Sequence, residues 1–175
     1  MQASQTSQDI GSAKIAGVRT ALQFIAIVMI ALVAGSMFGI WRGYAPDAYS
    51  ALTFLETHQG AVRGLNLILP LMGGVALVQT GILAVLARRR GAIVWPYLAA
   101  LVLMAVAAII TRFANQPINA EVMTWLPDSI PANWTAVRDS WWAWHVLRMA
   151  VSVGGLAVLI LAVFIDRGRG QAENY

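Results

Sequence analysis

Three polar stripes in otherwise apolar parts of the sequence hold the residue types that acid–base chemistry needs. In the first, Trp141, His145 and Arg148 follow one another at intervals of four and three residues, at the start of a long apolar run. This spacing places all three side chains on one face of an α-helix. Two further stripes have the same mixed character: His58, Gln59, Arg63 and Asn66, and Arg112, Asn115 and Asn119.

The residue types in these stripes predict proton abstraction next to a stabilised negative charge. A neutral imidazole can accept a proton, and guanidinium groups can stabilise the oxyanion that forms. His145 and His58 are the two histidines of the chain, so either is a candidate base. Arg112 and Arg148 are the candidate oxyanion-stabilising groups. The candidate substrate-binding residues are Gln59, Arg63, Asn66, Asn115, Asn119, Trp141 and Trp144.

Two other interpretations of the same residues stay open. His58, His145 and Glu56 could form an iron site of two histidines and one carboxylate, although the spacing of Glu56 and His58 matches no tight ligand motif. We therefore expect no metal and no other cofactor. Arginines near the ends of membrane spans also often extend only toward lipid headgroups, which is the interpretation we favour for Arg42 and Arg138. The asparagines and Gln59 could simply join one helix to another.

The elements that must position these residues are membrane-spanning helices. The chain of 175 residues is 59% hydrophobic and 11% charged, where a soluble domain carries about 25% charged residues. A hydrocarbon core of about 30 Å needs roughly 20 apolar residues. We predict an all-α bundle of four transmembrane helices in one domain over residues 14–168. The spans are expected at about 17–41, 63–87, 92–113 and 141–165, with a disordered tail at 1–13 and a second tail at 169–175.

The distribution of charge predicts the orientation of this bundle. If four spans alternate, seven cationic and three acidic residues fall on one side: Lys14, Arg19, Arg88, Arg89, Arg90, Arg167 and Arg169, with Asp9, Asp166 and Glu173. The excess of Lys and Arg assigns this side, and both termini, to the cytoplasm. The net charge of +4 therefore indicates topology, and no nucleic-acid partner is expected. The expected location is the plasma membrane, as in a bacterial inner membrane.

In this topology the three polar stripes lie at the outer ends of their helices. Polar residues inside a span usually face the bundle interior or a wet cavity, because lipid cannot satisfy them. We therefore predict a polar pocket in the outer leaflet, covered by the two outer loops. The expected partners are the bilayer and a lipophilic small molecule, and a homo-oligomer stays open.

Prolines set the expected irregularities of these helices. Pro70 continues the stripe of Gln59 and Asn66 and is expected to kink the second span. Pro117 either lies within a continuing helix or marks the first turn of a new one. Ser129 is a candidate cap for a helix with Pro131 in its first turn, and this helix is expected to run unbroken into the last span.

The same residues resemble the DUF1772 or anthrone-oxygenase-like family of four-span membrane proteins. The resemblance rests on His58-Gln59 leading to Asn66 and Pro70, on the segment from Asn115 to Asn119, and on the segment from Trp144 to Arg148. It covers most of the chain from the first span to the last. Many members of that family have asparagine where this chain has His145.

The resemblance implies an oxygenase, because some fungal members oxidise anthrones to anthraquinones without a metal or flavin. By this resemblance, His145 or His58 would remove a ring CH proton from a lipophilic anthrone- or phenol-like substrate. Arg112 and Arg148 would stabilise the enolate, and the carbanion would react directly with O2. The alternative is a non-catalytic membrane subunit that binds a lipid, a quinone or another protein through the Arg/Trp pocket.

Overall fold

The computed structural model describes residues 2–172, and within this range the chain forms helices and loops without a strand. Four long helices carry most of the chain: α1 (Gln2–Gly43), α3 (Ile68–Ala87), α4 (Val94–Ile110) and α6 (Trp134–Ala172). Shorter elements connect them: η1 (Pro46–Ala48), α2 (Ala51–Leu65), η2 (Arg88–Ile93), η3 (Thr111–Asn115) and α5 (Gln116–Val122). The prediction of an all-helical protein is confirmed.

The long helices pack around a shared apolar core. α1 packs against α3 and α6, and α4 packs against the same two helices. Small and branched side chains such as Ala26, Leu83 and Leu159 fill the interior. Large apolar side chains such as Val78 and Phe164 instead point outward and are exposed. Apolar residues on both the inside and the outside of a helical assembly are typical of a protein surrounded by lipid.

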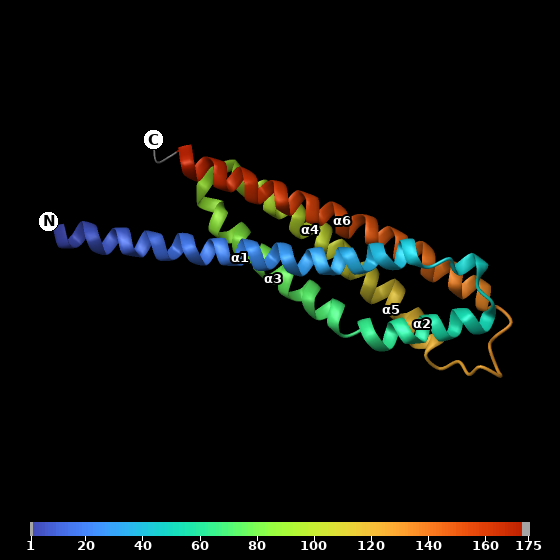
Figure 1. Cartoon of the computed structure of the whole chain (residues 1–175). Helices are drawn as coiled ribbons and strands as arrows, with labels where there is room; N and C mark the ends of the chain where they lie inside the picture. Colours follow the sequence, from blue (N-terminus) through green and yellow to red (C-terminus); the bar gives the residue numbers. More distant parts are fainter. Residues whose placement is uncertain (1, 173–175) are drawn as a thin grey trace.

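Three segments are long and apolar enough to cross a membrane: Lys14–Ala48, Ile68–Val122 and Trp134–Gly168. The second of these is 55 residues long, because it includes both α3 and α4. Between them the chain reverses at η2, where Gly91 has a φ of 71°. This left-handed conformation suits glycine, which has no Cβ to obstruct it. α4 then runs back along α3 (Figure 1).

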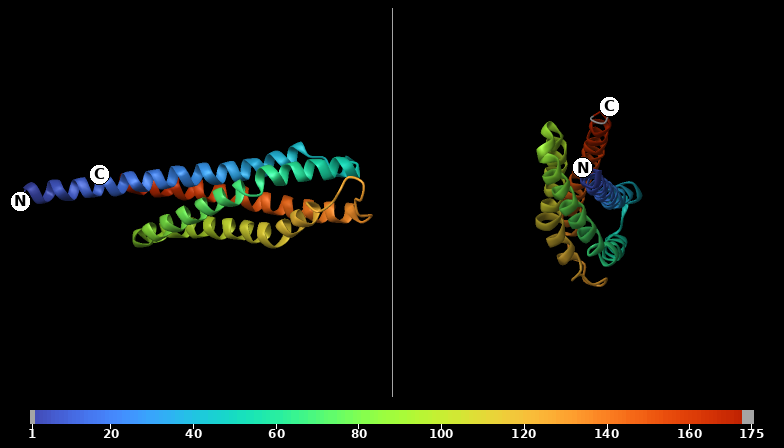
Figure 2. Two further views of the ribbon diagram at one scale, coloured as in Figure 1. Left: turned by 90° about the horizontal axis from the view of Figure 1, so that it is seen from below. Right: turned by 90° about the vertical axis from the view of Figure 1, so that its left-hand side faces the viewer.

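The described chain begins and finishes at the same end of the molecule, which we call the terminal end (Figures 1 and 2). α2 and α5 lie at the opposite end, which we call the α2 end. A second, smaller core of Phe54, Leu55, Val122 and Trp125 joins these two helices. The reversal at η2 belongs to the terminal end (Figure 1).

The second predicted span differs from the structure at its start. Instead of a kinked helix over 63–87, the helix is interrupted at Asn66 and Leu67, and Arg63 belongs to α2. Pro70 explains the position of the break, because it has no N–H to donate to the carbonyl of Asn66 and its ring would collide with that group. In the first turn of α3 the missing N–H costs nothing.

Pro117 has a milder effect on the helix that contains it. The chain continues from α4 into α5 through the π-helical turn η3, in which the N–H of Gln116 bonds to the carbonyl of Thr111. The wider turn accommodates the proline without ending the helix. Asn115 and Asn119 are buried and face the interior, whereas Arg112 on the same turn is exposed.

The ends of the outer helices also differ from the expected boundaries. α1 already begins at Gln2, so residues 2–13 have a helical backbone where a disordered tail was expected. A helix that is already formed extends at little cost, because only its nucleus is unfavourable. α6 begins at Trp134 rather than near Ser129 and extends through residues 169–172. Its unbroken course into the last span agrees with the prediction.

Candidate functional site

A cavity of about 250 Å³ lies between the long helices toward the α2 end. Most of its wall is apolar, with side chains from α1, α2, α3, α4 and α6. The polar side chains in its wall include residues from all three predicted stripes: His58, Asn66, Arg112, Asn119, Trp141 and Arg148. The structure therefore brings together residues that are up to 90 positions apart in the sequence. We call this space the inner cavity.

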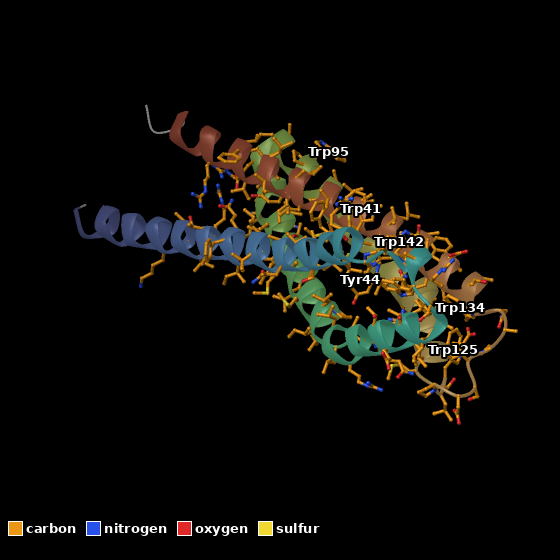
Figure 3. All side chains as sticks on the ribbon, turned by 45° about the vertical axis from the view of Figure 1, so that its right-hand side comes forward. Trp41, Tyr44, Trp95, Trp125, Trp134 and Trp142 are labelled. Atoms are coloured by element: carbon orange, nitrogen blue, oxygen red, sulfur yellow. The ribbon has the colours of Figure 1, made fainter. Side chains whose placement is uncertain are left out.

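Aromatic side chains gather around the same end of the molecule. Trp41, Tyr44, Trp125, Trp134 and Trp142 lie toward the α2 end, whereas Trp95 lies apart from them (Figure 3). Tryptophan and tyrosine collect where a bilayer meets water. The inner cavity therefore lies beside an aromatic belt of this kind.

Trp141 is the centre of a hydrogen-bond chain that crosses the cavity wall. Its indole Nε1 donates to Oδ1 of Asn119 at 2.9 Å, and Nδ2 of Asn119 donates to Oδ1 of Asn66 at 3.1 Å. Nδ2 of Asn115 donates to the backbone carbonyl of Trp141 at 3.2 Å. These bonds fix the positions of α6, α5 and the break before α3 relative to one another. Oδ1 of Asn115 is buried without a partner.

His145 is fully buried, and both of its ring nitrogens have partners. Nε2 lies 3.0 Å from the carbonyl oxygen of Met37, and Nδ1 lies 3.1 Å from Nη2 of Arg148. A carbonyl only accepts and a guanidinium only donates, so the proton of the neutral ring is on Nε2. The ring is also stacked on Trp141, with the centroids 5.1 Å apart. His145 is not part of the cavity wall, so its contacts are those of a residue that positions Arg148.

His58 is the histidine that contributes to the wall of the inner cavity. Its side chain is buried, its ring packs edge-on against Trp141 at 4.7 Å, and its Nε2 has no hydrogen-bond partner. It belongs to α2, which lies between two of the candidate spans. Burial lowers the pKa of the His58 imidazole to about 4, and the positive charge of Arg148 acts in the same direction. The ring is therefore neutral at pH 7.

Arg148 brings a buried positive charge to the cavity wall. The residue is 9% exposed, and its Nε has no hydrogen-bond partner. Among the described residues it forms no ion pair with a carboxylate, and its Nη2 donates a hydrogen bond to Nδ1 of His145. A buried charge without a counter-charge is costly. A ligand with a negatively charged or strongly polarised oxygen would remove that cost.

The remaining predicted site residues have mainly structural contacts. Nε2 of Gln59 donates to the carbonyls of Val122 and Trp125, and Arg63 bonds to Gln59 on the exposed side of α2. These bonds satisfy carbonyls at the end of α5. Trp144 is 41% exposed and lies outside the cavity wall.

The structure does not bring together the ligands of the alternative metal site. Glu56 is exposed on α2, whereas His58 on the same helix is buried. In the part of the chain that the structure describes, no group of three His, Cys, Asp or Glu side chains is close enough to hold a metal ion.

A second polar cluster at the terminal end was missed in the sequence. Asp166 is 1% exposed, and its Oδ1 lies 2.8 Å from Nη2 of Arg19 and 3.0 Å from Nη1 of Arg90. Its Oδ2 accepts hydrogen bonds from Nε2 of Gln23 and the hydroxyl of Tyr97. We call these residues the Asp166 cluster. The signal in the sequence was Gln23 and Asp166, single polar residues at the edges of two long apolar runs.

Taken together, the long apolar helices and the buried polar wall define an integral membrane protein with an internal ligand-sized cavity. Residues 61–158 match the family model described as anthrone oxygenase. The match covers more than half of the chain, so the protein belongs to the anthrone oxygenase-like family, DUF1772. It includes Arg112 and Arg148 but begins just after His58. The searches of curated proteins and of solved structures gave no match.

Proposed function

We propose that this protein is a four-span membrane oxygenase that oxidises a lipophilic, anthrone- or phenol-like aromatic substrate in its inner cavity. α1, α3, α4 and α6 are the four proposed crossings. Support for an even number comes from the two ends of the described chain, which lie at the same end of the molecule. The arginines near that end favour a cytoplasmic location for it. The inner cavity then belongs to the outer leaflet.

The observation that carries the proposal is the buried, unpaired guanidinium of Arg148 beside the unpartnered Nε2 of His58. A cation and a neutral base in one apolar cavity suit a reaction that creates an anion from a neutral substrate. Within the cavity the low dielectric strengthens the attraction between Arg148 and a developing oxyanion. Of the two candidate bases, His58 is the better supported, because both ring nitrogens of His145 are engaged.

The proposed reaction begins when Nε2 of His58 takes one proton from the ring CH2 group of the substrate. The electron pair delocalises onto the carbonyl oxygen of the substrate, which becomes an enolate next to Arg148. The carbanionic carbon transfers electrons to O2 and forms a C–O bond, and the imidazolium returns its proton to the peroxide. Loss of the second C–H proton with hydroxide forms the new carbonyl. Overall, one substrate molecule and one O2 give one quinone and one water.

The proposal needs no metal or organic cofactor, because the carbanion itself reduces O2. A metal-dependent version would need ligands beyond His58. The other alternative is a non-catalytic subunit whose cavity holds a lipid headgroup or a quinone. Arg148 favours any ligand with an anionic oxygen, so this alternative shares the same binding chemistry and differs in having no turnover. A homo-oligomer stays open in both cases.

The experiment is oxygen uptake by purified protein in lipid vesicles with a panel of anthrones and hydroquinones. We expect uptake to fall about 10²–10⁴-fold in His58→Ala, the range for loss of a general base. Leu147→Ala, an exposed position next to Arg148, is the matched control and should retain wild-type uptake. With ¹⁸O2, the quinone formed from an anthrone should gain one labelled atom. Uptake equal to that of empty vesicles would contradict the proposal, and a co-purified lipid or quinone would then support the alternative.

A further inference from the structure

A second cavity of about 450 Å³ adjoins the inner cavity. The two cavities share several wall residues, among them Asn66, Arg112, Gln116 and Asn119. The second cavity adds Ala120 and Met123 from the end of α5. The two spaces therefore adjoin each other at these shared residues.

Two of the residues that line both cavities lie at or next to irregular stretches of backbone. Asn66 belongs to the break before α3, and Asn119 follows the π-helical turn η3. The two side chains are joined by one hydrogen bond of 3.1 Å. A single amide bond between side chains contributes only about 1 kcal/mol net. This bond, whose two residues line both cavities, can therefore break without unfolding a helix.

The surroundings of the second cavity are those of a membrane-facing opening. Leu67, next to Asn66, is 75% exposed, and Phe113, next to Arg112, is 74% exposed. Large apolar side chains with this exposure belong in lipid rather than in water. Arg112 is exposed between them, its guanidinium lies 5.8 Å from the ring centroid of Phe113, and it forms no ion pair among the described residues.

We infer that the second cavity is a lateral doorway through which a membrane-dissolved, weakly acidic aromatic substrate reaches the inner cavity. The inference deepens the proposed function and rests on it for the identity of the substrate. Arg112 binds the phenolic oxygen first, because it is the cation that lines both cavities. The Asn66–Asn119 bond then opens, and the oxygen passes from Arg112 to Arg148. Arg112 is thus a selectivity residue for acidic aromatics.

The absence of cysteine from the chain allows a test that does not depend on turnover. A nitroxide is attached to Ala120→Cys in vesicles, and its collisions with O2, which is concentrated in lipid, are compared with those of a water-soluble nickel chelate. We expect access from the lipid phase to dominate. Val102→Cys, an exposed site on α4 away from both cavities, gives the reference for full lipid exposure. Dominant collisions with the chelate, or none with either reagent, would overturn the doorway.

Turnover then tests the role of the doorway in catalysis. Modification of Ala120→Cys with a bulky maleimide should lower kcat/KM more than tenfold, whereas the same reagent on Val102→Cys should change nothing. Arg112→Gln should raise KM for phenolic substrates about tenfold, because it removes the cation that binds the phenolic oxygen first. Wild-type turnover that survives the maleimide would refute the doorway but not the oxygenase. Lipid access at position 120 without any turnover would refute the oxygenase but not the opening.

Discussion

The two polar regions of this protein contain similar residues and differ in how completely they are paired. In the Asp166 cluster at the terminal end, two arginines share one carboxylate, whose second oxygen accepts bonds from Gln23 and Tyr97. At the α2 end, and among the described residues, Arg148 has no acidic partner and Nε2 of His58 has no hydrogen-bond partner. The first region joins helices, whereas the second surrounds a cavity.

In the Asp166 cluster, hydrogen bonds and ion pairs within the chain offset the cost of burying polar groups. In the wall of the inner cavity, the described residues do not offset that cost. The Asp166 cluster connects α1, η2, α4 and α6 through groups that satisfy one another. The wall of the inner cavity contains a cation, Arg148, and a base, His58, that lack such compensation among the described residues. Stability is commonly lost at sites that must bind something else. The comparison therefore assigns a structural role to one region and a binding role to the other.

Arg148→Met is expected to have the largest effect on kcat, and it tests whether Arg148 has a binding role rather than a structural one. Removal of a group that stabilises an oxyanion lowers kcat about 10²–10³-fold, or roughly 3–4 kcal/mol. Thermal stability in detergent should stay the same or increase, because an uncompensated buried charge is replaced by an apolar side chain. The measurements are oxygen uptake and the midpoint of thermal unfolding. A large fall in stability with unchanged kcat would place Arg148 in the structural class instead.

Asp166→Asn should have the opposite profile, with the effect on stability. The change removes the carboxylate that Arg19 and Arg90 share, and we expect a loss of about 3 kcal/mol in unfolding free energy, toward the lower limit for a broken buried pair because both arginines are partly exposed. Asp139→Asn is the matched control, since its pair with Arg138 is exposed and such pairs contribute about 0–1 kcal/mol. Equal unfolding midpoints for the two variants would contradict the structural role of the cluster.

A smaller effect is expected on the pH dependence of the unfolding free energy, through the buried ring of His58. The folded-state pKa of His58, about 4, lies below its ordinary value of 6.5, so the folded protein favours the neutral ring. This contribution to stability is complete above pH 6.5 and is lost as the pH falls from 6.5 toward 4. We expect a loss of about 2 kcal/mol between pH 8 and pH 5 that His58→Gln abolishes. An identical pH dependence in wild type and variant would show that His58 is not shielded from water.

Much of the fold could be predicted from the sequence, because the long apolar runs leave few alternatives to membrane helices. The spacing of Trp141, His145 and Arg148 also placed these residues on one inward-facing stripe. The break before α3 was only partly anticipated. Pro70 indicated a kink, but its collision with the carbonyl of Asn66 interrupts the helix four residues earlier.

The pairing of the polar groups could not be predicted from spacing along one helix. His58 and His145 are equivalent in a sequence, and only the positions of Met37 and Arg148 distinguish the engaged ring from the free one. The Asp166 cluster joins residues from three distant parts of the sequence, around positions 19–23, 90–97 and 166, so no local pattern indicates it. Trp144 belongs to the same segment as Trp141, yet a step of three residues turns it toward the exposed side of α6.

α6 gives the two regions a mechanical connection. Arg148 and Asp166 lie on one uninterrupted helix, separated by about 27 Å along its axis. A helix of this kind acts as a lever whose fixed point is the Asp166 cluster. A tilt of about 5° around that point moves Arg148 by about 2 Å, which is more than a hydrogen bond tolerates. A change in the Asp166 cluster that tilts α6 would therefore displace the guanidinium of Arg148 from the position that His145 gives it, although the two sites lie at opposite ends of the helix.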